Sequence, residues 1–268
     1  MEGSTERAGL RVRADGAVFE IVLDRPAKRN AIDMGMLERL REAIAEARQV
    51  PGVRAVLLRG EGKAFSAGID VTALMSLGQV YGPDWARWMR DITRDIQSVF
   101  NALEQLELPV IALLHGYCLG LGLELALACD WRIAAAGTRL GLPEVRLGLI
   151  PDVGGSTRLS RLVGPGRAKE LVMTGRQIEA EQAERWGLVN RVVDEGELEA
   201  TGRELVAELG GCAPLAVGMA KRVIDGGCDL ARGLALEGWA QSQLVRSEDL
   251  AEGLQAFAQK RPPEFKGR

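Results

Sequence analysis

Three carboxylate side chains are candidates for acid–base chemistry, and two of them, Glu144 and Asp152, stand in apolar surroundings, where a carboxyl group could accept and donate protons near neutral pH. Glu124 follows a glycine-rich turn, and Glu144 and Asp152 lie within the apolar segment 142–155. Burial raises the pKa of a carboxyl group because the charged form loses its hydration, so these residues are the candidate general acids and bases. Structural roles are also open: Glu124 suits the first turn of a helix, and Asp152 could cap a helix that begins near Val153.

Two glycine-rich segments could present backbone amides to an anionic oxygen. Small residues in the loop 60–70, which follows a buried apolar run, would let a ligand approach the main chain closely. The turn 116–124 leads into a short helix, whose first N–H groups and positive dipole end favour developing negative charge. The N–H of Leu121 is the candidate donor in this turn. Either segment alone is equally compatible with a tight surface turn.

The rest of the composition argues against several other chemistries. The one histidine, His115, ends an apolar run without an evident partner, so we interpret it as a hydrogen-bonded structural residue. The four cysteines lack the spacing of a zinc or redox site, and no metal site is expected. The net charge of −3 arises from 34 basic and 37 acidic residues that are interleaved, so no nucleic-acid partner is expected.

The chain also lacks the usual features of a membrane or exported protein. No apolar run approaches the roughly 20 residues that a membrane helix needs, so no membrane partner is expected. The first seven residues contain two glutamates and no apolar stretch, unlike a signal or transit peptide. We therefore expect a cytoplasmic protein.

The elements that must position these residues alternate between strands and helices. Two extended runs, 10–14 and 18–23, are joined by Asp15-Gly16 and predict a hairpin. Apolar periodicity then predicts a helix between Asn30 and Pro51, a strand over 53–58, a long helix over 84–107, a strand up to Leu114, a short helix over 123–129 and a strand over 131–135. This alternation predicts an α/β core in which helices cover a buried sheet.

From about Gly196 onward the pattern predicts helices alone, with breaks near 210–211, 226–227 and Ser247. We therefore interpret residues 1–195 as the core that carries the site and residues 196–268 as a separate helical region. The apolar stripe of this region is wider than one solitary helix could bury. It could pack on a partner subunit, although ordinary core packing would also explain it.

Several motifs, in order along nearly the whole chain, resemble the enoyl-CoA hydratase and isomerase (crotonase) superfamily. They are Leu23-Asp24-Arg25-Pro26 with Asn30-Ala31, the loop 64–70, the turn 116–124 with Ala128-Cys129-Asp130, Pro143-Glu144, Gly155 through Arg158-Leu159, and the tail 253–262. The resemblance implies a ββα spiral core, a C-terminal helical trimerisation region, and a homotrimer or a dimer of trimers. It also implies an acyl-CoA thioester substrate; coenzyme A is then part of the substrate, and neither a separate cofactor nor a metal is needed.

By position, the resemblance implies an oxyanion hole made by the N–H groups of Ala67 and Leu121. These groups would bind the thioester oxygen of an enolate, a contact worth roughly 3 to 4 kcal/mol per donor in other oxyanion holes. The resemblance also places Gly68, Ile69 and Asp70 against the substrate. Members of the family usually carry glycine where Leu121 stands, and the leucine side chain could narrow the acyl pocket.

Three further residues are implied to contact coenzyme A. Lys28 would meet its phosphates, whereas Phe257 and Lys260 would reach the coenzyme A of a neighbouring subunit. The loop from Val71 to Asp84 would set the length of the acyl chain.

The resemblance leaves two reactions open. Hydratases of the family use two glutamates to add water at the β-carbon, and retention of Glu124 and Glu144 favours this reaction, with Glu144 supplying the proton to the α-carbon. Asp152 departs from the hydratase pattern, because the dienoyl-CoA isomerases use acids at all three positions. We predict an enoyl-CoA hydratase that converts a trans-2-enoyl-CoA to a 3-hydroxyacyl-CoA, with dienoyl-CoA isomerase as the alternative. A noncatalytic homologue that binds coenzyme A or RNA is a third interpretation, which the two glutamates and the lack of a basic stripe oppose.

Overall fold

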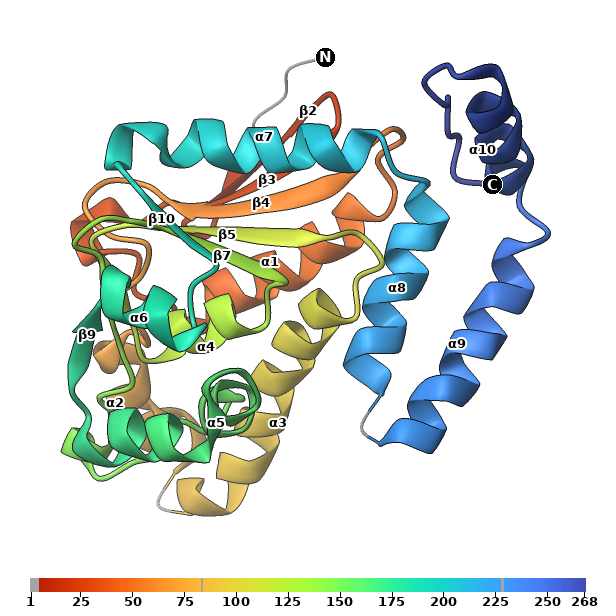
Figure 1. Ribbon diagram of the computed structural model, residues 1–268. Coiled ribbons are helices and arrows are strands. Elements are labelled where there is room, and N and C mark those ends of the chain that lie inside the picture. The colour runs from red at the N-terminus through yellow and green to blue at the C-terminus, as the bar shows by residue number, and fades with distance from the viewer. Residues whose placement is uncertain (1–4, 83, 228) are drawn as a thin grey trace.

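A seven-stranded sheet forms the centre of the computed structural model, which describes residues 5–82, 84–227 and 229–268 (Figure 1). Its strands, in spatial order, are β1 (Thr5–Arg7), β2 (Leu10–Asp15), β3 (Val18–Leu23), β4 (Ala55–Gly60), β5 (Val110–Leu114), β7 (Trp131–Ala135) and β10 (Arg191–Val193). The pairs from β1 to β3 are antiparallel, and the pairs from β3 to β10 are parallel. The predicted hairpin is confirmed, with Asp15 paired to Val18 across the turn.

Helices cover both faces of this sheet, as the alternating pattern predicted. Helix α7 (Leu198–Gly210) lies along one face, and α1 (Met34–Ala47), α3 (Trp85–Glu104) and α4 (Leu121–Leu127) lie on the other (Figure 1). Strands β3 and β5 are buried along their whole length, as expected of strands covered on both sides. No helix in the described part of the chain is both long and apolar enough to cross a membrane.

A second, three-stranded sheet lies beside the first and was not predicted. Its order is β6 (Tyr117–Leu119), β8 (Arg139–Gly141) and β9 (Gln177–Glu179). The 3₁₀ turn η2 (Glu144–Leu147) and helix α5 (Gly155–Thr174) connect β8 to β9, and helix α6 (Ala180–Trp186) follows β9. Strand β6 leads into α4 and strand β8 leads toward η2, so this small sheet sets the positions of Glu124 and Glu144.

Two predicted elements differ from the structure. The segment expected as a loop after Val71 is helix α2 (Val71–Tyr81), whose N-terminus is capped by the Asp70 carboxylate accepting from the Thr72 N–H at 3.0 Å. The short helix expected over 123–129 is α4 (Leu121–Leu127), which begins two residues earlier because Gly120 adopts a positive φ of 51° and ends the preceding strand. The earlier start makes Leu121 the first residue of the helix.

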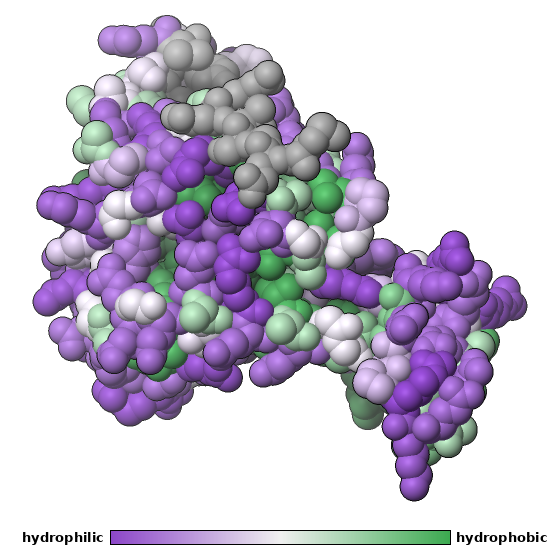
Figure 2. Space-filling model, turned by 90° about the horizontal axis from the view of Figure 1, so that it is seen from above, coloured by the Kyte–Doolittle hydropathy of each residue, from purple (hydrophilic) through white to green (hydrophobic). Residues whose placement is uncertain are grey.

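In the described part of the chain, the regular elements after β10 are all helices, as predicted. They are η3 (Glu195–Glu197), α7, α8 (Pro214–Gly226), α9 (Leu230–Leu244) and α10 (Glu248–Gln259). Both glycine breaks end helices, and the Ser247 hydroxyl caps α10 by accepting from the Leu250 N–H at 3.2 Å. Whereas α7 packs on the sheet, α9 and α10 project from the body (Figures 1 and 2), and a groove lies between α8 and the ends of α1 and α3. The boundary at residue 196 stays a prediction.

Candidate active site

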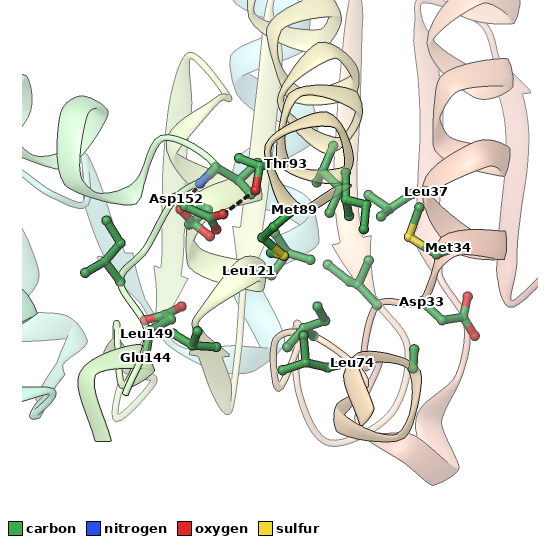
Figure 3. Close-up of a pocket in the computed structure, with 18 residues that line it drawn as sticks. Asp33, Met34, Leu37, Leu74, Met89, Thr93, Leu121, Glu144, Leu149 and Asp152 are labelled. Carbon is green, nitrogen blue, oxygen red and sulfur yellow. Dashed lines mark hydrogen bonds between the residues drawn. The ribbon is translucent and has the colours of Figure 1, made fainter. Parts of the chain in front are cut away.

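A cavity of about 90 Å³ lies between α1, α2, α3, α4 and the segment 144–153 (Figure 3). That volume exceeds the roughly 10 to 15 Å³ that one water needs. The apolar part of its wall is formed by Ile32, Met34, Leu37, Ile69, Ala73, Leu74, Met89, Ile92, Ile96, Leu121, Leu149, Ile150 and Val153. Glu124, Glu144 and Asp152 all line the same cavity. Figure 3 shows Asp152 and Glu144 at one end and Asp33 at the other.

Glu124 projects from the first turn of α4 and is only 2% exposed. Its Oε1 atom accepts hydrogen bonds from the N–H groups of Val153 at 2.8 Å and Gly155 at 2.7 Å. Burial raises the pKa of Glu124 to about 8, the neighbouring Glu144 adds to the rise, and the two amide hydrogen bonds oppose it. Because both amides bond Oε1, the other oxygen is left to carry a proton or to bond a water.

Glu144 is the first residue of η2 and faces the same cavity. Its Oε2 atom is buried and has no hydrogen-bond partner among the described residues. Burial raises the pKa of Glu144, and the negative charge of Asp152 adds to the rise. A buried carboxyl oxygen without a partner is costly in a folded protein, so this atom is suited to a ligand or a water.

The raised pKa of Glu124 predicts a pH dependence of folding stability. A carboxyl group whose pKa moves from 4.5 to about 8 on folding binds its proton more tightly in the folded state. Its stabilising effect is therefore complete below about pH 4.5 and is lost as the pH rises through about 8. We expect the Tm of the wild type to fall more steeply over this range than that of Glu124→Gln, which cannot ionise. Thermal unfolding of both proteins across the range measures this; parallel curves would contradict it.

Asp152 does not cap a helix, contrary to one sequence interpretation. Helix α5 begins at Gly155, and its N-cap residue is Gly154, with φ of 107° and no side-chain cap. The Asp152 carboxylate instead accepts a hydrogen bond from the Thr93 hydroxyl of α3 at 2.6 Å. The hydroxyl comes from a helix that sequence analysis had not connected with the site. Asp152 is thus held at the cavity wall by α3.

The N–H of Ala67, expected as an oxyanion-hole donor, already has an acceptor within the protein. The Ala67 N–H donates to the Arg29 carbonyl at 2.9 Å, and the Gly68 N–H donates to the Ser66 hydroxyl at 3.1 Å, so neither group is free. In the described residues no acceptor is found for the N–H of Ile69. The reason is a parallel bridge to Ile32 that uses the carbonyl of residue 68 and the N–H of residue 70, which turns the N–H of residue 69 the other way.

The loop that carries the free N–H of Ile69 approaches the first residue of α4 at Gly68. A Cβ atom at Gly68, where φ is 99°, would lie 2.9 Å from the Leu119 carbonyl oxygen and 3.5 Å from the Leu121 nitrogen. Glycine at this position therefore permits the close approach of the two segments. Leu121 is the first residue of its helix, so its N–H has no acceptor within the helix. Both Ile69 and Leu121 line the cavity.

The remaining predicted binding residues lie outside the cavity wall. Asp70 caps α2 and pairs with Arg25 at 3.1 Å, so its visible role is structural. Lys28, the last residue of η1 (Pro26–Lys28), lies 3.6 Å from the Asp70 carboxylate and has 54% of its side chain exposed. Phe257 and Lys260 lie at the end of α10, away from the cavity, and Phe257 is 86% exposed.

His115 has the structural role that was predicted for it. Its Nε2 atom lies 3.0 Å from the Gly62 carbonyl oxygen, to which it can donate, and it does not line the cavity. In the described part of the chain no three histidine, cysteine or acidic side chains are placed to hold a metal ion.

Comparisons with known proteins agree with this geometry. The profile of the family described as Enoyl-CoA hydratase/isomerase matches residues 13–268. The chain is 40% identical over 258 residues to a short-chain-enoyl-CoA hydratase of Clostridium acetobutylicum, covering 95% of this chain and 96% of that protein. It is 39% identical over 272 residues to a carnitinyl-CoA dehydratase of Salmonella typhi, covering 97% and 98%.

Solved structures give the same result for the fold. An enoyl-CoA hydratase from Bacillus anthracis superposes with a TM-score of 0.90 and 39% identity, over 97% of this chain and 100% of that chain. An enoyl-CoA hydratase from Polaromonas sp. JS666 superposes with a TM-score of 0.88 and 28% identity, over 96% and 99%. The predicted α/β fold class and the resemblance seen in the sequence motifs are confirmed.

Proposed function

The chain belongs to the enoyl-CoA hydratase/isomerase family, and from that premise we propose that it adds water to a trans-2-enoyl-CoA to give a 3-hydroxyacyl-CoA. One observation carries the proposal. Two carboxyl groups with raised pKa values, the buried Glu124 and the half-buried Glu144, line one apolar cavity beside two backbone N–H groups that have no acceptor among the described residues. The names of the relatives support the same reaction.

The two N–H groups act as the oxyanion hole. We assign them to Ile69 and Leu121 rather than to Ala67, because the Ala67 N–H already donates to Arg29. They bind the thioester oxygen and stabilise the negative charge that develops there as the β-carbon is attacked. Two fixed donors in a cavity with a largely apolar wall stabilise this charge more than water would.

The two carboxyl groups move the protons. Glu124, in its charged form, accepts a proton from the water whose oxygen bonds to the β-carbon. Glu144, in its neutral form, donates a proton to the α-carbon of the enolate. Since both pKa values are raised, the pair can hold one proton between them near neutral pH, which is the state that this step requires.

Substrate binding beyond the acyl group belongs to the same proposal. Lys28, whose Nζ atom lies 3.6 Å from the carboxylate of Asp70, the residue after the 66–69 loop, is assigned to the phosphates of coenzyme A. The exposed Phe257 and Lys260 are assigned to a neighbouring subunit of a homotrimer or a dimer of trimers. In this scheme coenzyme A is part of the substrate, and the protein's own groups supply all the acid–base chemistry. The cytoplasmic location stays a prediction.

A dienoyl-CoA isomerase is the second candidate, because Asp152 brings a third carboxylate to the cavity wall. Its Oδ2 atom is already bonded to Thr93, which favours a positioning role over proton transfer. The deciding measurement uses the wild type with trans-2-enoyl-CoA thioesters of several chain lengths. Loss of the conjugated-enone absorbance, with formation of the 3-hydroxy product, supports the hydratase. No loss with any of them, together with turnover of a 3,5-dienoyl-CoA, would establish the isomerase instead.

The variant Asp152→Asn separates the two reactions further. Asparagine keeps the side-chain shape and an oxygen that can accept from Thr93, but it removes the charge. We expect hydration to fall by roughly tenfold or less, since the proton-transfer pair is intact and about one hydrogen bond is weakened. Steady-state kinetics of wild type and variant measure the change. A loss of a thousandfold would place Asp152 among the proton-transfer groups and favour the isomerase.

A further inference from the structure

The segment 152–155, which donates two backbone N–H groups to Glu124, also accepts two hydrogen bonds from side chains of α3. Gln97 donates through Nε2 to the Asp152 carbonyl at 2.6 Å, and Thr93 donates to the Asp152 carboxylate at 2.6 Å. The two side chains are four positions apart in α3, so they project from the same face of the helix. Helix α3 therefore contacts both the backbone and the side chain of Asp152.

The bond from Gln97 reaches Glu124 through a single peptide group. The Asp152 carbonyl and the Val153 N–H belong to one planar trans peptide, so they point in opposite directions. Gln97 bonds one edge of this peptide at 2.6 Å, and Glu124 Oε1 bonds the other edge at 2.8 Å. Rotation of the peptide would break both bonds. A carbonyl that accepts a hydrogen bond also makes the N–H of its peptide a stronger donor, so the three groups form one cooperative chain.

The second peptide that bonds Glu124 is fixed within the first turn of α5, where the Thr157 hydroxyl also donates to its carbonyl at 3.3 Å. Its N–H belongs to Gly155, and its Gly154 carbonyl accepts from the Arg158 N–H at 2.7 Å in the first turn of α5. Backbone bonds of a helix thus fix this peptide. The peptide between Asp152 and Val153 is fixed by Gln97 instead.

We propose that Gln97 is a positioning residue for the hydration reaction, acting on Glu124 through the peptide between Asp152 and Val153. The inference rests on the proposed function, because it assumes that Glu124 activates the water. Gln97 does not line the acyl cavity; it borders a separate groove along the segment 150–158. Its bond keeps the Val153 N–H aimed at Oε1, which leaves the other oxygen of Glu124 for the water and favours the charged form.

Three variants of Gln97 test this. Gln97→Leu removes the donor at similar size, Gln97→Glu keeps the shape but replaces the N–H donor by an oxygen, and Gln97→Lys restores an N–H donor. We expect the first two to lower kcat by about tenfold, the rate equivalent of one hydrogen bond, with little change in KM. Loss of the donor disfavours the charged form of Glu124 and raises its pKa, so the acidic limb of the kcat profile moves to higher pH. Gln97→Lys should recover most of kcat.

The control is Gln105→Leu, the same substitution at an exposed glutamine just beyond the end of α3, which should behave as wild type. The carboxyl titration of Glu124, followed by ¹³C NMR and assigned with Glu124→Gln, gives a readout that needs no turnover. If the wild type did not hydrate any trans-2-enoyl-CoA, the proposed function would be overturned. The titration would still test whether Gln97 controls the pKa of Glu124. Active wild type with an unchanged titration and kcat in Gln97→Leu would overturn the inference. The inference would also be overturned if Gln97→Leu lowered kcat without moving the pH profile and Gln97→Lys did not recover activity. That result would indicate a structural role only.

Discussion

Replacing Glu144 by glutamine is expected to lower kcat for hydration by roughly 10²- to 10⁴-fold, the usual contribution of a positioned acid or base. Glutamine keeps the size and the carbonyl oxygen of the side chain, but it cannot donate a proton to the α-carbon at any accessible pH. The buried Oε2 atom, which has no partner in the described residues, is the oxygen placed to carry that proton. KM should change little, because the thioester oxygen and the acyl chain bind elsewhere. Steady-state kinetics across pH measure both constants.

A matched control and a double variant sharpen the test of Glu144. Glu208→Gln makes the same chemical change on the exposed side of α7 and should leave kcat unchanged. Glu124→Gln should also lose activity, and the double variant should lose little more than the worse single variant, because groups that act as a unit are not additive. Retention of most activity in Glu144→Gln would remove Glu144 from the proton-transfer pair. Hydration would then have to proceed with Glu124 alone.

The sequence predicted the structure best where neighbouring residues alone determine an element. The hairpin at Asp15-Gly16, the long stripe of α3 and the glycine breaks after α7 and α8 all depend on neighbouring residues, and all are confirmed. Glu144 could be selected from its apolar sequence surroundings, and Glu124 from its place in the first turn of a helix after a glycine-rich turn. In contrast, β6, β8 and β9 are three residues each, too short for apolar alternation to be recognised.

The parts of the site that were missed depend on contacts between distant segments. The resemblance assigned the donor to Ala67 by position, whereas a bridge to Ile32, which the sequence does not reveal, leaves the N–H of Ile69 without an acceptor among the described residues. The bond from Gln97 to Asp152 joins residues 55 positions apart. On the helix, Gln97 looks like any polar residue of an amphipathic stripe. Only the tertiary structure shows that it faces the segment that holds Glu124.

Replacing Leu121 by proline is expected to lower kcat by about 10²- to 10³-fold, the usual effect of removing one donor from an oxyanion hole. Leu121 is the first residue of α4, and proline is tolerated at that position because the N–H has no acceptor within the helix. The substitution therefore removes the assigned donor without removing a helix hydrogen bond. Its ring carbon would also occupy the space that the thioester oxygen needs. Kinetics with a short trans-2-enoyl-CoA, together with the Tm, separate this effect from unfolding.

The matched variant Leu121→Gly keeps the N–H and removes only the side chain. Since the leucine side chain lines the acyl cavity, its loss should enlarge the cavity and shift the preference toward longer or branched acyl groups, while kcat for a short substrate stays within about tenfold of wild type. The pair of variants thus separates the two roles of one residue: the amide serves the reaction and the side chain serves selectivity. If proline and glycine lowered kcat equally in folded proteins, the Leu121 N–H would not be an oxyanion donor. The thioester oxygen would then bind at Ile69 alone or elsewhere in the cavity.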